Sequence, residues 1–339
     1  MQIGVIGAGA IGGTLAALLN RSGHDVSITA RGASLKTIRE TGLHLDGAWG
    51  KHSAGVKAAE TLTETPDLAF LCTKAHDAAI AIQQNAHHLR NTTVVIVQNG
   101  LDGLAEASRL LPNSECVGAL ALFAASYRSP GRFQVTTAAN TYLGAGNGAA
   151  PTAATRAARI LHTAMPACAV SNFVGCQWTK LIINQINAMP AITGLSVQET
   201  IANRQLRHII THSMQEAVRI GYGNGVRYGR IQGLNNTLLR WISGVPPFLA
   251  QSVPLLIKRR LGPTPNPGST LQSIRRGQRT EIDYLNGTIV DRARLIGSDA
   301  PINRIVTELV HEVEKTRAFF SVADVTDRVA AAHTKGKHE

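Results

Sequence analysis

The chain has few cysteines, and this shortage excludes several classes of protein. Four cysteines occur among 339 residues, and they form no CxxC pair and no zinc-like spacing. A disulfide framework is disfavoured in a chain of this length, so we expect reduced thiols, no metal site and a cytoplasmic location. The first residues also lack the basic start of a signal peptide and resemble a strand instead.

Long hydrophobic runs are also absent. The longest uncharged stretch that could be considered as a membrane span, Trp241–Ile257, has 17 residues and contains three prolines. It is short and broken for a membrane-spanning helix, so no membrane insertion is expected. Hydrophobic residues nevertheless make up 44% of the chain and charged residues only 17%, which excludes intrinsic disorder. The length fits two domains that each bury a core.

Acidic residues are scarce in one region. The chain has 34 Lys and Arg against 22 Asp and Glu, a net charge of +12. Residues 201–279 contain 12 of the basic residues and a single acid, Glu216. Steering of an anionic small ligand is a sufficient reason for this charge, while a larger anionic substrate or a surface contact remains open. No helix-turn-helix, RNA-binding or zinc signature is present, so we expect no nucleic-acid partner.

Apolar runs and helical patterns alternate through the first half. Strands are expected at 3–7, 25–30, 67–72 and 93–98, and helices at 11–21, 31–41 and 75–89. This alternation predicts βαβ units and a parallel sheet. The short pieces in 117–144 are expected to be antiparallel strands that close the sheet edge, followed by a helix at 152–164 and a strand at 169–171.

The second half lacks strand signals. Helices are expected at about 173–189, 204–221, 231–260 (interrupted), 269–296 and 302–318. We expect a domain at 1–171, a helical substrate and dimerisation domain at 172–330, and a polar, frayed tail at 331–339. Helical domains of this kind often dimerise, so a homodimer is one of the expected assemblies.

A glycine pattern follows the first strand. The spacing is G-x-G-x-x-G, formed by Gly7, Ala8, Gly9, Ala10, Ile11 and Gly12. The first glycine permits a tight turn, the second lets backbone approach a pyrophosphate, and the third lets helix pack on strand. The alternative is a glycine turn without a ligand. In this position the pattern predicts a Rossmann-type, dinucleotide-binding α/β domain, followed by the all-helical C-terminal domain.

Three residues at the ends of later strands extend this prediction. Arg31 ends the second strand where an acid would bind a free ribose 2′-hydroxyl, which favours NADPH over NADH because a guanidinium pairs with a 2′-phosphate. Lys74 and Asn99 each follow a parallel strand, at the edge where such sheets bind ligands. The alternatives are an ordinary surface arginine, a solvated lysine and a turn asparagine before Gly100.

One helix in the second half carries polar residues at helical spacing. Lys180, Asn184 and Asn187 stand at i, i+4 and i+7 among Ile and Leu, so they share a face. A partly buried lysine has a lowered pKa and becomes a better proton donor near neutral pH. The alternative is a hydrogen-bonded seam between helices with a lysine that reaches solvent.

Two further segments hold candidate residues. Ser269 is expected to be the N-cap of a helix. Glu281 lies in the sequence RTEIDYLNG, where Thr280 and Asp283 have the spacing of a capping box. On spacing alone, Glu281 is a first-turn acid favoured by the helix dipole.

Together these residues resemble the ketopantoate reductase family over nearly the whole chain. The motifs are GAGAIG, Arg31, CTKAH at 72–76, QNG at 98–100, WxKLxxN at 178–184, and SxLQ…RTEIDYLNG at 269–287. The resemblance implies NADPH-dependent reduction of a 2-oxo acid to a 2-hydroxy acid, with 2-dehydropantoate and pantothenate biosynthesis first among the possibilities. It also implies binding of a small oxo-acid substrate.

The resemblance also implies roles for individual residues. Lys180 is the general acid, and Glu281 orients the substrate hydroxyl and holds Lys180. Arg31 and Lys74 contact the cofactor phosphates. Asn99, Asn184 and Ser269 bind polar groups of the substrate, with Asn187 as a further substrate-binding candidate, and Asn99 also binds the cofactor.

Three departures from the family pattern concern the substrate. Where the family has its second asparagine this chain has Ala188, and the nearest asparagine is Asn187. Where the family has an acidic residue after the LQ motif, this chain has Ser273. The segment Tyr222–Gly268 is longer than is typical. A different 2-oxo acid, or a non-catalytic NADP-sensing role, therefore remains an alternative.

Overall fold

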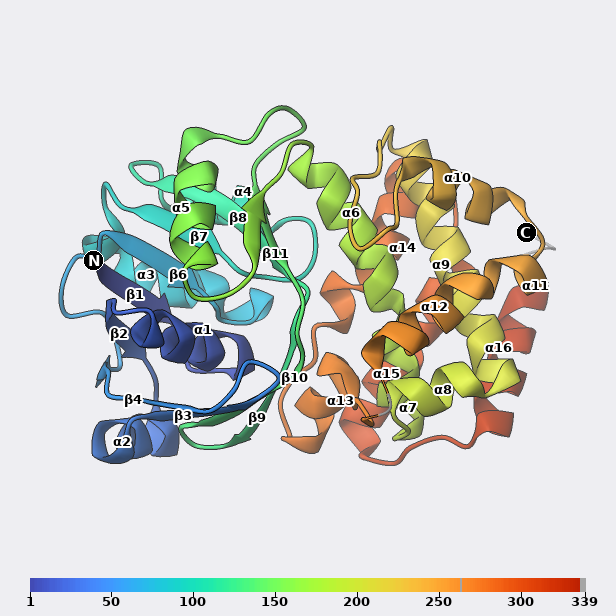
Figure 1. Cartoon of the computed structure of the whole chain (residues 1–339). Helices are drawn as coiled ribbons and strands as arrows, with labels where there is room; N and C mark the ends of the chain where they lie inside the picture. The colour runs from blue at the N-terminus through green and yellow to red at the C-terminus, as the bar shows by residue number, and fades with distance from the viewer. Residues whose placement is uncertain (263, 336–339) are drawn as a thin grey trace. The chain divides into compact units, whose positions relative to one another are not determined.

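The computed structural model describes residues 1–262 and 264–335 and divides the chain into two compact units, Met1–Val174 and Gly175–Glu339 (Figure 1). The expected boundary after residue 171 lies in the loop between strand β12 (Ala167–Ala169) and helix α6 (Phe173–Asn184). The first unit contains a parallel sheet and the second is helical, which confirms the predicted fold class.

An eight-stranded sheet organises the first unit, in the order β12-β11-β8-β7-β6-β1-β2-β5. Its remaining strands are β1 (Gln2–Ile6), β2 (Asp25–Thr29), β5 (Lys57–Ala59), β6 (Leu68–Leu71), β7 (Thr93–Ile96), β8 (Glu115–Ala121) and β11 (Thr141–Gly144). All neighbours from β8 to β5 are parallel, and β11 is antiparallel to β8. The chain continues from β1 to β2 on one side and later returns to β6 on the other. The strand order therefore reverses beside β1, where open α/β sheets bind ligands.

Alternation of side chains along the central strands assigns the two faces of this sheet. Phe70 and Val95 pack in the core beneath α1 (Ala10–Arg21) and α5 (Thr152–His162). Their neighbours Leu71 and Ile96 pack beneath α3 (Ala78–Leu89) and α4 (Gly103–Leu110). Burial on both faces explains why β6 is apolar throughout and β7 is apolar after Thr93. Helix α2 (Gly32–Thr41) follows β2.

A second sheet corrects the prediction for residues 117–144. Its order is β4-β3-β10-β9, with β3 (Leu43–Gly47), β4 (His52–Ala54), β9 (Ala124–Ser129) and β10 (Arg132–Thr137). Only β8 and β11 join the edge of the main sheet, and the expectation that all these pieces close that edge is wrong. β3 and β4 were not predicted, and β10 joins β3 by a parallel pairing between segments far apart in sequence.

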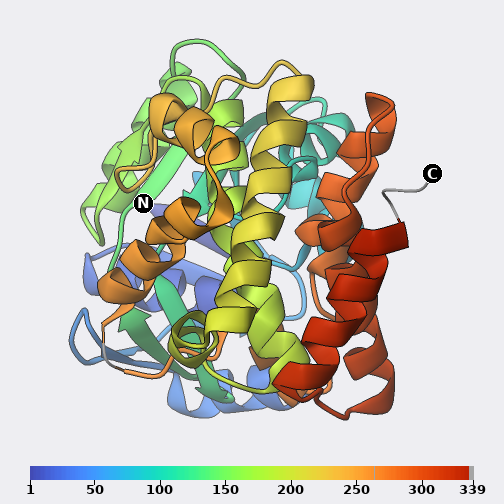
Figure 2. The same ribbon diagram turned by 90° about the vertical axis from the view of Figure 1, so that its right-hand side faces the viewer.

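The second unit is built around the long helix α9 (Arg204–Gly223) (Figure 2). Its yellow ribbon runs between the red α15 and α16 and the orange helices α10 to α12. The other helices of this unit are α7 (Ala188–Thr193), α8 (Val197–Ala202), α10 (Asn236–Gly244), α11 (Pro247–Ala250), α12 (Ser252–Leu261), α13 (Gly268–Arg275), α14 (Asn286–Leu295), α15 (Pro301–Thr316) and α16 (Val322–Lys335).

Several helix boundaries differ from the prediction. The expected helix at 269–296 is interrupted after α13, where Gly277 has a φ of +66°, and the chain resumes with the 3₁₀ turn η3 (Ile282–Tyr284) and α14. Helix α16 extends through residues assigned to the tail as far as Lys335. The rest of the predicted tail, 336–339, lies outside the described residues. Helix α8 was missed although Ser196 and Glu199 form a capping box before it.

A buried polar network joins α9, α14 and α15 to the segment after α6. Asn286 Nδ2 donates to Gln185 Oε1 at 2.6 Å and to Asn303 Oδ1 at 3.0 Å. The Ser213 hydroxyl oxygen lies 2.9 Å from each of the same two oxygen atoms and can donate its single proton to either. The Glu216 carboxylate accepts from the Asn303 side chain at 2.8 Å and from the first amides of α15. The single acid of the basic region is therefore buried as a helix cap.

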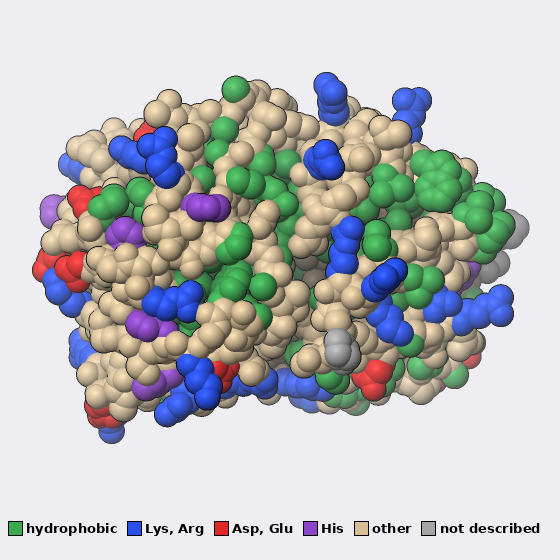
Figure 3. Space-filling model, viewed as in Figure 1, with side chains coloured by type: hydrophobic (Ala, Val, Ile, Leu, Met, Phe, Trp, Pro, Cys, Tyr) green, Lys and Arg blue, Asp and Glu red, His purple; other side chains and the backbone are tan. Residues whose placement is uncertain are grey.

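Helices α10 to α12 present apolar side chains to solvent. Trp241 is 46% exposed and Phe248 71% exposed, and Leu249, Leu255 and Leu256 are also exposed. Green side chains gather over these helices on the right of Figure 3, with blue basic side chains nearby. The stretch Trp241–Ile257 is broken between three helices, and among the described residues no helix is long and apolar enough to span a bilayer.

Candidate active site

The glycine-rich turn between β1 and α1 has the geometry that dinucleotide binding requires. Gly7 has a φ of +103°, and its amide donates to the Thr29 hydroxyl on β2 at 3.0 Å. A Cβ on Gly12 would overlap the Gly7 carbonyl oxygen, so the helix can approach the strand only with glycine there. A Cβ on Gly9 would meet no atom within 4 Å. The space beside Gly9 is therefore open for a ligand, as the second glycine of the pattern predicts.

Gly13, which follows the pattern, is explained by packing alone. A Cβ at this position would overlap the ring of Phe133 on β10. Phe133 is buried in the core beneath α1. The second sheet therefore rests directly on the helix that begins at the glycine turn.

The other predicted cofactor residues of the first unit lie at the carboxyl ends of neighbouring parallel strands. Arg31 follows β2 and precedes α2, is exposed, and donates to Gln84 Oε1 at 2.5 Å. Lys74 follows β6 and precedes the 3₁₀ turn η1 (Ala75–Asp77). Asn99 follows β7, just before Gly100, whose φ is +88°. β1, β2, β6 and β7 are neighbours in the sheet, so these residues share the edge that bears the glycine turn.

Gln98 was not predicted, and it connects two of these loops. Its Nε2 donates to the Thr73 carbonyl oxygen at 3.0 Å. The loop after β7 is thereby fastened to the loop after β6, next to Asn99 and Lys74. Its place in the QNG motif beside Asn99 was the available signal.

Lys180 lies on the last part of α6 and is 8% exposed. Burial lowers the pKa of its ammonium to about 8, and the negative charge of Glu281 offsets part of that fall. The neighbouring Thr179 hydroxyl donates to the carbonyl oxygens of Gly175 and Gly229, which fastens this part of α6 to a distant loop. A buried lysine with a pKa near 8 exchanges its proton in the neutral range.

The two asparagines after Lys180 face each other across a change of helix type. α6 ends at Asn184, and the 3₁₀ turn η2 (Gln185–Asn187) follows. Residues three apart eclipse in a 3₁₀ helix, and Asn187 Nδ2 lies 3.4 Å from Asn184 Oδ1. The expectation of one continuous helix at 173–189 is therefore wrong. The 3₁₀ turn nevertheless keeps Asn187 beneath Asn184.

The prediction that Ser269 is the N-cap of its helix is wrong. Helix α13 begins at Gly268, after Pro267, and the capping acceptor is Asn266, whose Oδ1 receives the Gly268 amide at 2.8 Å. A Cβ on Gly268 would lie 2.8 Å from Asn187 Oδ1. The absence of a side chain at 268 therefore brings the start of α13, and Ser269 with it, close to Asn187. The Ser269 side chain itself is exposed.

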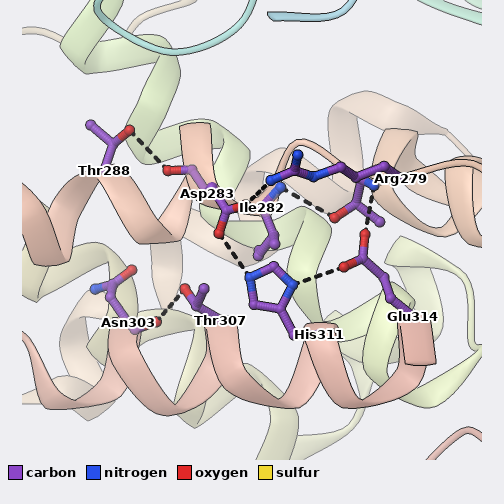
Figure 4. A network of polar contacts seen from close by, with 9 residues as sticks. Arg279, Ile282, Asp283, Thr288, Asn303, Thr307, His311 and Glu314 are labelled. Atoms are coloured by element: carbon purple, nitrogen blue, oxygen red, sulfur yellow. Dashed lines mark hydrogen bonds and ion pairs between the residues drawn. The ribbon is translucent and has the colours of Figure 1, made fainter. Parts of the chain in front are cut away.

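Glu281 precedes η3 in an irregular turn, and the predicted alternative of a capping box at 280–283 is wrong. Thr280 Oγ1 accepts from the Ile282 amide at 3.3 Å, and the Asp283 carboxylate binds Arg279 and His311 (Figure 4). Thr280 and Asp283 are thus engaged in other contacts. The carboxylate of Glu281 acts on the buried ammonium of Lys180.

The structure therefore brings the predicted residues together within each unit. In the first unit the glycine turn, Arg31, Lys74 and Asn99 share one sheet edge. In the second unit the charge of Glu281 acts on Lys180, and Asn184 contacts Asn187 next to the start of α13.

Comparisons with known proteins agree with these motifs. The family model "Ketopantoate reductase PanE/ApbA" matches residues 3–148, and "Ketopantoate reductase PanE/ApbA C terminal" matches residues 172–314. The chain belongs to the ketopantoate reductase family. Members of this family are oxidoreductases that act on a CH–OH group with a pyridine nucleotide, and this protein is an oxidoreductase of that class.

Relatives match along nearly their full length. A 2-dehydropantoate 2-reductase of Pyrococcus horikoshii is 27% identical over 317 residues, covering 93% of this chain and 98% of the relative. One from Mesorhizobium japonicum is 28% identical over 351 residues, covering 95% and 100%. The crystal structure of a PanE/ApbA family ketopantoate reductase from Ralstonia eutropha matches with a TM-score of 0.76 and 27% identity, covering 94% and 99%.

A more distant structure shares the fold. It is the ternary structure of a D-mandelate dehydrogenase with NADH and anilino(oxo)acetate, with a TM-score of 0.77 and 20% identity over 93% of this chain and 99% of that chain. The same fold in that protein thus holds NADH and anilino(oxo)acetate.

Proposed function

We propose that this ketopantoate reductase family member reduces a 2-oxo acid to the 2-hydroxy acid with NADPH, and that 2-dehydropantoate is its substrate. The observation that carries the proposal is the buried Lys180 beside the charge of Glu281, with its pKa lowered to about 8. An ammonium in that condition can give a proton to a carbonyl oxygen that is becoming an alkoxide. The product would be pantoate, a precursor in pantothenate biosynthesis.

The residues of the glycine turn fit a dinucleotide. Gly9 leaves open space at the start of α1, and no acidic residue lies in the first turn of that helix to repel a pyrophosphate. Arg31 lies where an acid would select the free ribose, so its guanidinium favours a 2′-phosphate. Lys74 adds a cationic contact to the phosphates. NADPH, when bound, supplies the hydride.

The residues of the second unit handle the oxo acid. Lys180 donates the proton and its charge stabilises the developing alkoxide. Glu281 orients the new hydroxyl and holds the ammonium. Asn184, Asn187 and Ser269 bind other polar atoms of the substrate.

A second candidate substrate is a related 2-oxo acid of different shape. Two observations favour keeping it: Asn187 occupies a 3₁₀ turn one residue before the family's asparagine position, and Ser273 replaces the family's acid. The Ser273 side chain is buried, and its hydroxyl donates to the Ser269 carbonyl oxygen at 3.2 Å.

A panel of 2-oxo acids tests these proposals. Purified protein is mixed with NADPH and each acid, and the loss of NADPH absorbance is followed, with NADH in parallel and Lys180→Ala as the control. Turnover of 2-dehydropantoate with NADPH is the expected result. Turnover of another acid alone supports the second candidate, and tight NADPH binding without any turnover would support an NADP sensor.

A further inference from the structure

The turn that carries Glu281 is held by side chains of another helix. Between Arg275 at the end of α13 and Ile282 at the start of η3 the chain is irregular, and residues 275–279 are exposed. Glu281 itself has a φ of −104° and a ψ of 24°. Thr280 and Ile282, on either side of Glu281, are buried, and contacts to α15 add to this packing in holding the turn.

Two residues of α15 make those contacts, on either side of Glu281 (Figure 4). Glu314 Oε1 accepts from the Thr280 amide at 2.6 Å. His311 Nε2 lies 2.8 Å from Asp283 Oδ1, and its Nδ1 lies 2.8 Å from Glu314 Oε2. The residue before Glu281 is thus joined to α15 through Glu314, the residue two after it is joined through the His311 ring, and the ring also binds Glu314.

Both ring nitrogens of His311 face carboxylate oxygens, so only the imidazolium can donate to both. Burial lowers the pKa of His311, and the hydrogen bonds and charges of Glu314 and Asp283 outweigh it and raise the pKa above its ordinary value.

The other charged groups on the packed elements have different partners. Arg279 shares the Asp283 carboxylate, Arg328 of α16 binds Glu312, and Glu216 of α9 caps the far end of α15. On α14, Arg294 pairs with Asp291.

We propose that His311, as an imidazolium held between Asp283 and Glu314, is a positioning residue that fixes the turn bearing Glu281 and so places that carboxylate against Lys180. The inference rests on the proposed function for its kinetic consequence, but the placement itself concerns two side chains and can be measured without turnover. Deprotonation of His311 removes one of its two donated bonds and so weakens the link between Asp283 and Glu314.

The first experiment measures the pKa of Lys180 by NMR in the wild type and in Glu281→Gln, His311→Gln and Glu314→Gln. Loss of the Glu281 charge lowers the pKa of Lys180, because that charge raises it. His311→Gln should lower it in the same direction. Glu312→Gln is the matched control, because Glu312 lies on the same helix and binds Arg328 instead. A lowered value in Glu281→Gln with an unchanged value in His311→Gln would overturn the proposal.

The second experiment measures kinetics. In His311→Gln we expect kcat to fall about 10- to 100-fold, as for a misplaced catalytic group, with KM for NADPH unchanged. If His311→Gln does not fold, Glu314→Gln carries the same test, since its amide oxygen can still accept from Thr280. A lowered melting temperature of His311→Gln with unchanged kcat would mean that the contacts of His311 with Asp283 and Glu314 serve stability alone. An altered Lys180 pKa without turnover of any oxo acid would support the positioning role and reject the proposed function.

Discussion

Lys180 is buried, and the desolvation of its ammonium affects both its proton transfer and the stability of the fold. An ammonium loses hydration when it is buried, so its neutral form is favoured and its pKa falls. Glu281 recovers part of the loss. The same side chain therefore titrates near neutral pH and weakens the fold while it is charged.

The first prediction concerns the pH dependence of reduction. The proton donor is the ammonium, so kcat for 2-oxo acid reduction should be level below the Lys180 pKa of about 8 and fall about tenfold per pH unit above it. Lys180→Ala should lower kcat by about 10²- to 10⁴-fold. Steady-state rates at saturating NADPH between pH 6 and 10 measure both. A level profile through pH 10 would contradict the role of Lys180.

The second prediction concerns stability. The folded pKa of Lys180 lies below the unfolded value of 10.5, so its charge destabilises the fold below pH 8, and that penalty disappears as pH rises toward 10.5. Lys180→Met should raise the free energy of unfolding at pH 7 by up to about 3 kcal/mol. Thermal unfolding of both proteins at pH 7 and pH 10 should show the difference shrinking at the higher pH. A constant difference would indicate a packing effect instead.

The third prediction tests cofactor choice at Arg31. Arg31→Glu places an acid at the end of β2, where it repels a 2′-phosphate and can bind a free 2′-hydroxyl. We expect KM for NADPH to rise at least about tenfold, as for a lost charge-assisted contact, while KM for NADH falls. Arg39→Glu, on the exposed side of α2, is the control. Equal effects on the two cofactors would contradict the assignment.

At the scale of elements, two glycines near the start of α1 have different roles, one in ligand binding and the other in packing. Gly9 faces open space and Gly13 faces the ring of Phe133. Gly9→Ala should therefore cost less than about 1 kcal/mol of stability but weaken NADPH binding. Gly13→Ala should cost about 1–3 kcal/mol through overpacking. Melting temperatures and NADPH titrations of the two variants provide the comparison, and unchanged NADPH affinity in Gly9→Ala would contradict the proposed site.

Local patterns predicted the elements that depend on local physics. The buried strand β6 is apolar throughout, β7 is apolar after Thr93, and the glycine turn has a fixed spacing, so these elements were found from sequence. β3 and β10 were not paired in the prediction because strand pairing across many residues has no local signal. Helix α13 was placed one residue late, because Asn266 and not Ser269 supplies the cap.

The same distinction applies to the site. Helical spacing predicted that Lys180, Asn184 and Asn187 share a face. The sequence did not predict that a 3₁₀ turn places Asn187 beside Asn184. Glu281 was indicated only by the family resemblance, since its spacing favoured a helix-end acid. The contacts of His311 and Glu314 join α15 to a turn about 30 residues earlier, and nothing in the local sequence predicts them.

At the scale of the whole molecule, the basic excess offers a prediction about association. Residues 201–279 hold 12 basic residues, and their single acid, Glu216, is buried as a helix cap. A positive field of this kind speeds the approach of anions and is screened by salt. We expect kcat/KM for the oxo acid to fall severalfold between low and 0.5 M salt with little change in kcat.

The double substitution Arg259→Glu/Arg260→Glu on α12 should reduce both kcat/KM and its dependence on salt. Both side chains are exposed, so the fold should tolerate the change. An unaltered salt dependence would mean that this part of the charge serves a different contact.

The buried amide network also restricts which chimeras of this protein and a relative can fold. Gln185 precedes the 3₁₀ residue Asn187, Asn286 begins the helix after Glu281, and Asn303 lies near the start of α15, yet their side chains share hydrogen bonds. A chimera with a crossover between residues 216 and 286 would inherit Gln185 and Ser213 from one parent and both asparagines from the other. Unless the parents match at these positions, the hybrid would bury unsatisfied amides. The two halves of the proposed proton-transfer site are therefore expected to be inherited together.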